Sequence, residues 1–197
     1  MSEVLQPGPP GPQSGVNTWS RVARRIRVPL GFAFAIVYVW LARPSSSSLI
    51  LGALVLLPGL LLRGFASGHV QKDKQLTTSG PYAYTRNPLY LGSLMLALGF
   101  AIAARNWWIV AIMLVMFAVI YVPVIAGEER YLRQTFPGYD DYARHVPRMW
   151  PRLTPYGQQP SEYSSARYWK HREYQATLGC VVVLTILVIK LVVNPMW

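Results

Sequence analysis

Five long apolar stretches constrain the fold of this chain more than any other feature of its sequence. They cover residues 28–41, 49–62, 90–104, 107–126 and 176–193. A helix needs roughly 20 apolar residues to cross a bilayer, so the last two stretches suffice alone and the first three need flanking residues. With 52% hydrophobic and 14% charged residues, the composition is not that of a typical soluble domain. The sequence therefore predicts an all-α integral membrane protein with about five transmembrane helices, with a re-entrant hairpin as the alternative for the first two.

The basic residues predict how these helices are oriented, because lysine and arginine concentrate in short cytoplasmic loops. Sixteen of the nineteen lie before the first stretch, between the second and third, or between the fourth and fifth. The alternate loops hold only Arg43 and Arg105. We therefore expect the N-terminus and the polar segments 64–87 and 127–175 in the cytoplasm and the C-terminus outside. The net charge of +11 is then explained by anionic lipid headgroups, and nucleic acid is not expected as a partner.

The N-terminal region differs from the rest of the chain. Residues 1–20 are rich in proline and glycine, lack the apolar core of a signal peptide, and are predicted to form a disordered tail. Residues 21–197 are predicted to form a single membrane domain. Its only cysteine, Cys180, lies inside the last apolar stretch, so one chain can build neither a disulfide nor a multi-cysteine metal site.

The first polar segment ends in a pattern that favours a helix start. Asn87 is a good N-cap residue and Pro88 a good first helical residue, so the third helix is predicted to begin there. Its unpaired backbone amides and positive dipole end, with Arg86 beside them, are suited to an anion. The simpler interpretation is that the Asn-Pro pair only caps a helix and that the neighbouring tyrosines form an interfacial aromatic belt.

Two adjacent carboxylates, Glu128 and Glu129, follow the fourth apolar stretch. Near the membrane end of a helix, negative charge gains nothing from the helix dipole and is partly desolvated, so it requires a cationic partner. The simpler interpretation is that Glu129 pairs with Arg133 one turn later, which leaves Glu128 without an obvious local partner. A tight turn at 105–106 would return the chain and bring both polar segments to one side of the membrane.

Together the two segments would form a cytoplasmic pocket between the start of the third helix, the end of the fourth and the polar segment that follows. It would offer an anion site, a carboxylate for a cation, and tyrosines to cover a flat ring. S-adenosylmethionine has the matching groups, namely a carboxylate, an ammonium, a sulfonium and an adenine. The residues alone make this cofactor a candidate.

An ordered series of motifs supports the same interpretation. It reads Gly-x-Tyr-x-x-x-Arg-Asn-Pro-x-Tyr-x-Gly from Gly80, then an apolar hairpin, Glu-Glu-x-x-Leu from Glu128, Phe-Pro-Gly-Tyr-x-x-Tyr from Phe136, and Val-Pro-Arg from Val146. This series resembles the isoprenylcysteine carboxyl methyltransferase and phospholipid methyltransferase superfamily over somewhat more than a third of the chain. The resemblance implies a membrane methyltransferase that binds S-adenosylmethionine without a Rossmann domain and has its motif core at 74–152.

Carried over position by position, the resemblance implies a set of site residues. His145 and Arg86 are the candidate catalytic residues, with His145 acting only if the acceptor carries a proton. His145 belongs with Tyr142 and Pro147 to a covering segment. The expected cofactor-binding residues are Lys74, Gln75, Leu76, Thr77, Tyr82, Asn87, Pro88, Leu89, Tyr90, Glu128, Glu129 and Tyr142.

The chain departs from the family pattern at three places. Asn87 stands where the family often has histidine, and asparagine cannot titrate. Val124 stands where eukaryotic prenylcysteine enzymes have an arginine for the substrate carboxylate, which argues against carboxyl methylation of a prenylated cysteine. The helix at 176–193 is an addition to the family core.

The expected substrate is a lipophilic acceptor that enters from the bilayer, and its reacting group stays open among thiol, carboxylate, amine and phenol. Two other functions are considered beside methyl transfer. One is a nicotinamide-dependent membrane lipid or sterol reductase, and the other is a membrane scaffold protein without enzymatic activity.

Overall fold

All regular structure in the computed structural model is helical over the residues that it describes, which are 18–71, 75–157 and 162–193. The predicted all-α fold is confirmed over these ranges. Most of the predicted tail lies outside them, and the first helix begins at Thr18. The elements are α1 (Thr18–Leu41), α2 (Ser46–His69), η1 (Gly80–Ala83), α3 (Pro88–Ala104), α4 (Trp107–Met116), η2 (Phe117–Tyr121), α5 (Val122–Thr135), α6 (Tyr139–His145), α7 (Ser165–Lys170) and α8 (Tyr174–Val193).

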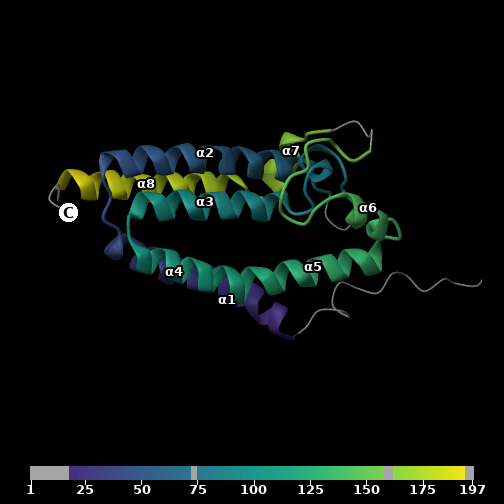
Figure 1. The fold of residues 1–197 in the computed structure, drawn as a ribbon, viewed down its shortest axis with the longest axis horizontal. Helices are drawn as coiled ribbons and strands as arrows, with labels where there is room; N and C mark the ends of the chain where they lie inside the picture. Colours follow the sequence, from purple (N-terminus) through teal and green to yellow (C-terminus); the bar gives the residue numbers. More distant parts are fainter. Residues whose placement is uncertain (1–17, 72–74, 158–161, 194–197) are drawn as a thin grey trace, which may run out of the picture.

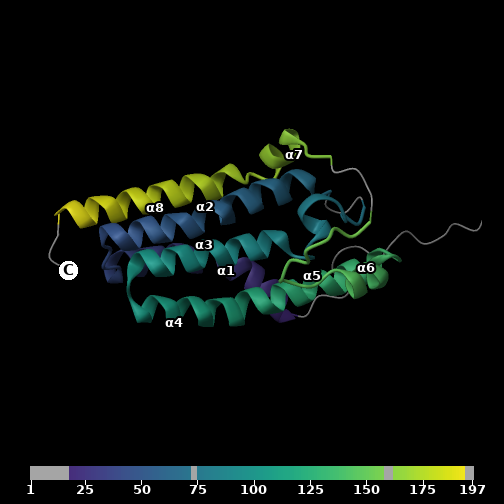
Figure 2. The same ribbon diagram turned by 45° about the horizontal axis from the view of Figure 1, so that its top comes forward.

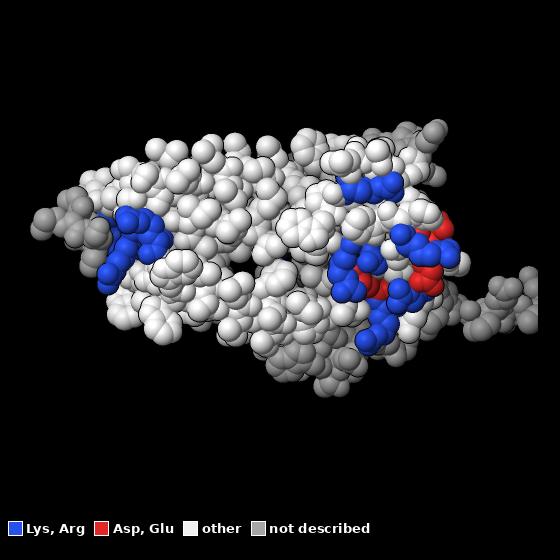
Figure 3. Space-filling model, viewed as in Figure 1, with Lys and Arg blue, Asp and Glu red and all other residues white. Residues whose placement is uncertain are grey.

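The five apolar stretches all form helices at the predicted positions. Within the described residues, three helices are long and apolar enough to cross a membrane: α2, the continuous helix Trp107–Thr135, and α8. The apolar parts of the other two, Pro29–Leu41 and Pro88–Ala104, are shorter. Five full spans therefore stay a prediction. Lysine and arginine on the face shown in Figure 3 gather near the two ends, with an uncharged band between them, as expected for a protein in a bilayer.

The long helices run side by side as a bundle (Figures 1 and 2). α3 packs along α2 and also contacts α4, while α8 lies against α2, and α1 packs on the helix formed by α4, η2 and α5. Helix α2 is longer than predicted, because it continues beyond residue 62 to His69. Its last two turns, together with the start of α3 and the end of α5, reach one end of the bundle, which we call the site end.

Glycines allow α2 and α3 to approach closely. A Cβ atom added at Gly52 would lie 2.6 Å from the Gly99 carbonyl oxygen, and one at Gly99 would lie 2.7 Å from the Gly52 carbonyl oxygen. Two helical turns further along, a Cβ at Gly92 would lie 2.9 Å from the Gly59 carbonyl oxygen. Small residues at such spacing are how membrane helices gain close backbone packing. This contact fixes the position of α3 on α2 and therefore the distance between their ends.

At the opposite end of the bundle, polar contacts join the turn between α1 and α2 to the turn between α3 and α4. The Arg43 amide donates to the Ala104 carbonyl at 2.8 Å, and the Asn106 side chain donates to the Leu41 carbonyl at 2.9 Å. Arg105 adopts a left-handed conformation with φ of 51°, and Asn106 caps α4 by accepting from the Trp108 amide. The predicted turn at 105–106 is confirmed, and both turns lie at the same end.

The helix that carries the paired carboxylates is interrupted by the π-helical segment η2. Pro123 lies two residues after the end of this segment and has no backbone N–H, so it cannot donate to a carbonyl of the preceding turn. At the junction the Val122 amide donates to the Phe117 carbonyl, five residues earlier. π-Helical turns within α-helices are frequent at functional sites. Here the wider turn lets the helix continue to Thr135 without a break in direction (Figure 1).

We predict that Gly99→Ala destabilises the protein, because the new methyl group would lie 2.6 Å from the Leu56 side chain as well as against backbone. Overpacking of this kind costs about 1–3 kcal/mol. Gly179→Ala is the matched control, because nothing lies within 4 Å of an added Cβ there. Thermal unfolding in detergent should show a lower melting temperature for the first variant only. Equal melting temperatures would contradict the close contact between α2 and α3.

Candidate active site

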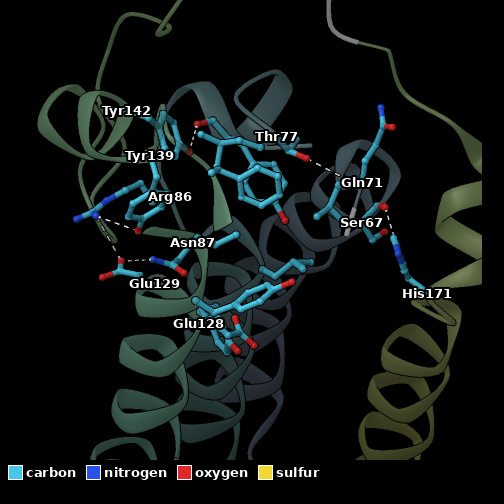
Figure 4. A pocket seen from close by; sticks show the side chains of 18 of the residues that line it. Ser67, Gln71, Thr77, Arg86, Asn87, Glu128, Glu129, Tyr139, Tyr142 and His171 are labelled. Atoms are coloured by element: carbon cyan, nitrogen blue, oxygen red, sulfur yellow. Dashed lines mark hydrogen bonds and ion pairs between the residues drawn. The ribbon is translucent and has the colours of Figure 1, made fainter. Parts of the chain in front are cut away.

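A cavity of about 700 Å³ lies at the site end of the bundle. Its walls come from the end of α2, residues 70, 71 and 75–77, η1, the start of α3, the end of α5, α6 and the residues just before α8. Figure 4 shows side chains from these elements pointing toward a common space. The volume is within the range of about 300–1,000 Å³ that is typical for small-molecule sites.

The start of α3 and the end of α5 are held together by the carboxylate of Glu129. Its Oε1 accepts from the Asn87 side-chain amide at 3.1 Å, and its two oxygens accept from Arg148 at 3.1 and 2.5 Å. Arg86 Nη1 lies 3.6 Å from the same carboxylate. Because the Glu129 side chain is only 7% exposed, these contacts replace the hydration that the charge loses on burial. The predicted proximity of the two segments is confirmed.

Two simpler expectations for these residues are wrong. Glu129 does not pair with Arg133, which instead donates to the exposed carboxylate of Asp140 at 2.6 Å. Asn87 occupies the N-cap position of α3, with Pro88 as first residue, but its side chain makes no capping hydrogen bond. The amide group donates to Glu129 and to the Arg148 carbonyl. A contact distant in sequence thus takes precedence over the local cap.

Glu128 faces the cavity from the last turns of the same helix (Figure 4). Its side chain is half-buried, and among the described residues no hydrogen bond or ion pair reaches its carboxylate. The neighbouring arginines are occupied elsewhere, since Arg86 and Arg148 contact Glu129. A partly desolvated carboxylate without a partner favours a cation, so this wall of the cavity is suited to a positively charged ligand.

Tyrosines form much of the remaining wall. The Tyr142 hydroxyl donates to the Tyr82 carbonyl at 2.7 Å, and Tyr90 packs edge-on against Tyr121 at 6.0 Å. Burial raises the pKa of Tyr82 far above its usual range, and the carboxylates of Glu128 and Glu173 add to the increase. Burial also raises the pKa of Tyr142. Both hydroxyls therefore stay protonated at neutral pH and present neutral groups and aromatic surface to the cavity.

The segment after α6 covers η1 through backbone hydrogen bonds. The Arg86 amide donates to the Pro147 carbonyl at 2.9 Å, and the Arg152 amide donates to the Tyr84 carbonyl at 2.9 Å. The Tyr156 amide donates to the Ala83 carbonyl at 3.0 Å. These contacts place α6 and its Tyr142 over the cavity. Tyr139 and Tyr142, in the polar segment 127–175, line the cavity.

Most of the predicted cofactor-binding residues line the cavity. His145 does not: its side chain is 55% exposed, and its Nδ1 lies 2.9 Å from the Asp141 carbonyl oxygen on the outer surface of α6. Pro88 is buried at the helix start behind the wall, and Lys74 lies outside the described residues. The predicted residues in the lining are Gln75, Leu76, Thr77, Tyr82, Arg86, Asn87, Leu89, Tyr90, Glu128, Glu129 and Tyr142.

The sequence analysis missed a second group of lining residues, which includes Arg63, Ser67, His171 and Glu173. The sequence predicted that Arg63 lies in the loop after the second apolar stretch, whereas it lies within α2. His171 and Glu173 come shortly before α8, the helix that was expected to be an addition to the core. Arg63 itself could have indicated this part of the site, because a charged residue inside an apolar helix needs a partner.

Comparison with known proteins places this chain among methyltransferases. A sequence model described as phospholipid methyltransferase matches residues 30–138, which is more than half of the chain. The protein-S-isoprenylcysteine O-methyltransferase of Schizosaccharomyces pombe is 28% identical over 142 residues, which are 68% of this chain and 59% of that protein. No solved structure matches the chain.

Two bacterial relatives are more similar over a shorter region. The cobalt-zinc-cadmium resistance protein CzcN of Cupriavidus metallidurans is 38% identical over 86 residues, 44% of this chain and 40% of that protein. The nickel-cobalt-cadmium resistance protein NccN of Alcaligenes xylosoxydans is 37% identical over 84 residues, 43% of this chain and 39% of that protein. The matched part thus spans less than half the length of each of these two relatives.

We predict that Glu129→Gln lowers stability by about 3 kcal/mol, because it leaves Arg86 beside a neutral partner in a buried position. Asp140→Asn is the control, because it removes the same charge from an ion pair in which both side chains are more than half exposed. Thermal unfolding in detergent should show a clear loss for the first variant and little change for the second. Similar effects of both substitutions would argue against the junction at Glu129.

Proposed function

Because the chain belongs to the phospholipid methyltransferase family, we propose that it transfers the methyl group of S-adenosylmethionine to a lipophilic acceptor at the cytoplasmic face of a membrane. The observation that carries the proposal is the carboxylate of Glu128, which faces the cavity without a partner among the described residues. S-adenosylmethionine brings two positive groups, a sulfonium and an ammonium, so a free carboxylate in a cavity of suitable size matches its charge.

The other walls are suited to the remaining parts of this cofactor. At the start of α3, the amide of Leu89 belongs to the first helical turn, where backbone donors lack helical partners and attract a carboxylate. Tyr82, Tyr90 and Tyr142 offer aromatic surface and neutral hydroxyls for the adenine. Arg86 adds positive charge beside the helix start, although it already contacts Glu129 and Tyr139.

The proposed catalysis rests on alignment. The bound cofactor supplies an electrophilic methyl group, and its transfer is an in-line displacement that depends mainly on proximity and orientation. In this chain Glu128 would meet the positive charge of the donor, and the start of α3 would hold its carboxylate. The tyrosines and the cover formed by α6 would exclude water. Tyr82 and Tyr142 do not serve as bases, because burial raises the pKa of both hydroxyls.

The acceptor is proposed to be an amphiphile that reaches the cavity from the bilayer. The basic residues at the site end favour a cytoplasmic orientation, which places the cofactor in contact with the cytosol. Val124 is 1% exposed, packs against Ile120 and is outside the cavity lining, so this position offers no contact for an acceptor carboxylate. The family match favours methyl transfer, and no observation favours the reductase or the scaffold.

We predict that the purified protein binds S-adenosylmethionine and S-adenosylhomocysteine but not reduced nicotinamide cofactors. Glu128→Gln should weaken S-adenosylmethionine binding by roughly tenfold, or about 1.4 kcal/mol, because a neutral amide replaces the carboxylate that meets the cation. S-adenosylhomocysteine lacks the sulfonium, so a larger loss for S-adenosylmethionine would place Glu128 at the sulfur. Calorimetry in detergent provides the measurement.

Asp140→Asn is the control for this test, because it removes an exposed carboxylate at the same end of the protein. It should leave both affinities unchanged. Unchanged cofactor affinity in a folded Glu128→Gln variant would remove Glu128 from the binding site. Binding of reduced nicotinamide in place of S-adenosylmethionine would contradict the proposed function itself.

A further inference from the structure

Arg63 is a charged residue inside the apolar helix α2, and its guanidinium reaches the cavity. Its Nε donates to Glu173 Oε1 at 2.5 Å, and its Nη1 donates to the Leu89 carbonyl at 3.3 Å and to the Ser93 hydroxyl. Its side chain is 21% exposed. Ionisable residues within membrane helices are costly, face cavities or partners, and often mark the path of a substrate.

Arg63 reaches further along α3 than the proposed cofactor contacts do. Its partner Ser93 lies in the second turn of α3, further along the helix than Asn87 and Pro88 at the helix start. The cavity therefore extends from the loop residues Gln75 and Thr77 to a depth where α3 is already an apolar helix. An amphiphile that enters from the bilayer would meet the guanidinium at this inner part of the cavity.

The ion-pair partner, Glu173, comes from a segment outside the region matched by the family model, which ends at residue 138. Other contacts hold this segment on α2. The Arg167 side chain donates to the Gly68 carbonyl at 2.7 Å, the Ser164 amide donates to the same carbonyl at 3.0 Å, and His171 Nδ1 lies 3.0 Å from the Ser67 carbonyl oxygen. The segment thus has anchors that do not depend on Glu173.

A buried ion pair contributes little net stability, because desolvation offsets most of the attraction between its charges. An incoming anion of similar geometry keeps the Arg63 guanidinium paired, so the exchange requires only that the released Glu173 carboxylate turns toward water. Guanidinium groups bind carboxylates and phosphates through parallel hydrogen bonds. Arg63 thus combines a position at the inner end of the cavity with a counter-ion that a ligand can replace.

We propose that Arg63 receives the anionic head group of the amphiphilic acceptor, and that Glu173 is its resident counter-ion, displaced when the acceptor binds. This inference rests on the proposed methyltransferase function. It adds the charge class of the acceptor, a carboxylate or a phosphate on an apolar chain, and it makes Arg63 a residue that determines specificity. The C-terminal segment before α8 then takes part in acceptor selection.

The test measures binding of four ten-carbon probes to the protein loaded with S-adenosylhomocysteine in a neutral detergent. The probes are decanoate, decyl phosphate, decylamine and decanol, and calorimetry gives their affinities. We expect at least one of the two anions to bind more tightly than both decylamine and decanol. Arg63→Met should weaken that binding by roughly tenfold or more, as expected when one member of a buried charge pair is lost, and Arg63→Lys should retain part of it.

Glu173→Gln separates an anion receptor from a merely structural ion pair. If Glu173 competes with the ligand, this variant should bind the preferred anion several-fold more tightly than the wild type. A structural pair would instead make both Glu173→Gln and Arg63→Met weaken binding, and that result would overturn the proposal. Equal affinity for all four probes, or binding of none of them, would overturn it as well.

The cofactor measurement keeps this test distinct from the test of the proposed function. Affinity for S-adenosylhomocysteine should stay close to the wild-type value in the Arg63 and Glu173 variants, which also shows that they are folded. If the wild type fails to bind S-adenosylhomocysteine, the proposed function fails. If the cofactor binds and the anions show no dependence on Arg63, only the acceptor inference fails.

Discussion

The buried carboxylate of Glu129 is the interaction on which the site depends. It joins α5 to the Asn87 amide at the start of α3 and to Arg148 in the covering segment. A carboxylate that is 7% exposed needs several donors, so the three elements are held in one arrangement. Because Glu129 is saturated, the adjacent Glu128 is left with its charge directed into the cavity. Adjacent residues of the same type thus have different tasks, one structural and one available for a ligand.

The packing of the helices determines how far the cavity extends. Close contact between α2 and α3 brings Arg63 to the Leu89 carbonyl and the Ser93 hydroxyl. The family-matched region supplies the wall with Glu128, whereas the segment before α8 supplies Glu173. In the proposed function the first wall meets the donor, and the inner part near Arg63 meets the acceptor. A donor site and a variable acceptor site within one cavity would let related proteins share a cofactor and differ in substrate.

The fold and about half of the site could be predicted from the sequence for clear physical reasons. The length of the apolar stretches predicted the helices, and the Asn87-Pro88 pair predicted the start of α3. Both signals are local in the sequence. The motif series also predicted most of the residues that line the cavity on the side of α3 and α5. The partners of Glu129 and Arg63 could not be read in the same way. They depend on contacts between residues far apart in the chain, such as Arg63 with Glu173, for which no local pattern exists.

The central claim is that the cavity opens to the cytoplasm and holds the methyl donor, and the reactivity of a single introduced thiol tests both parts. Gln75 is exposed and lines the cavity, so Gln75→Cys in a Cys180→Ala background offers such a thiol. A membrane-impermeant maleimide should label it in inside-out vesicles and not in right-side-out vesicles, and S-adenosylhomocysteine should slow the reaction. Labelling only in right-side-out vesicles, or a rate unaffected by S-adenosylhomocysteine, would contradict the account.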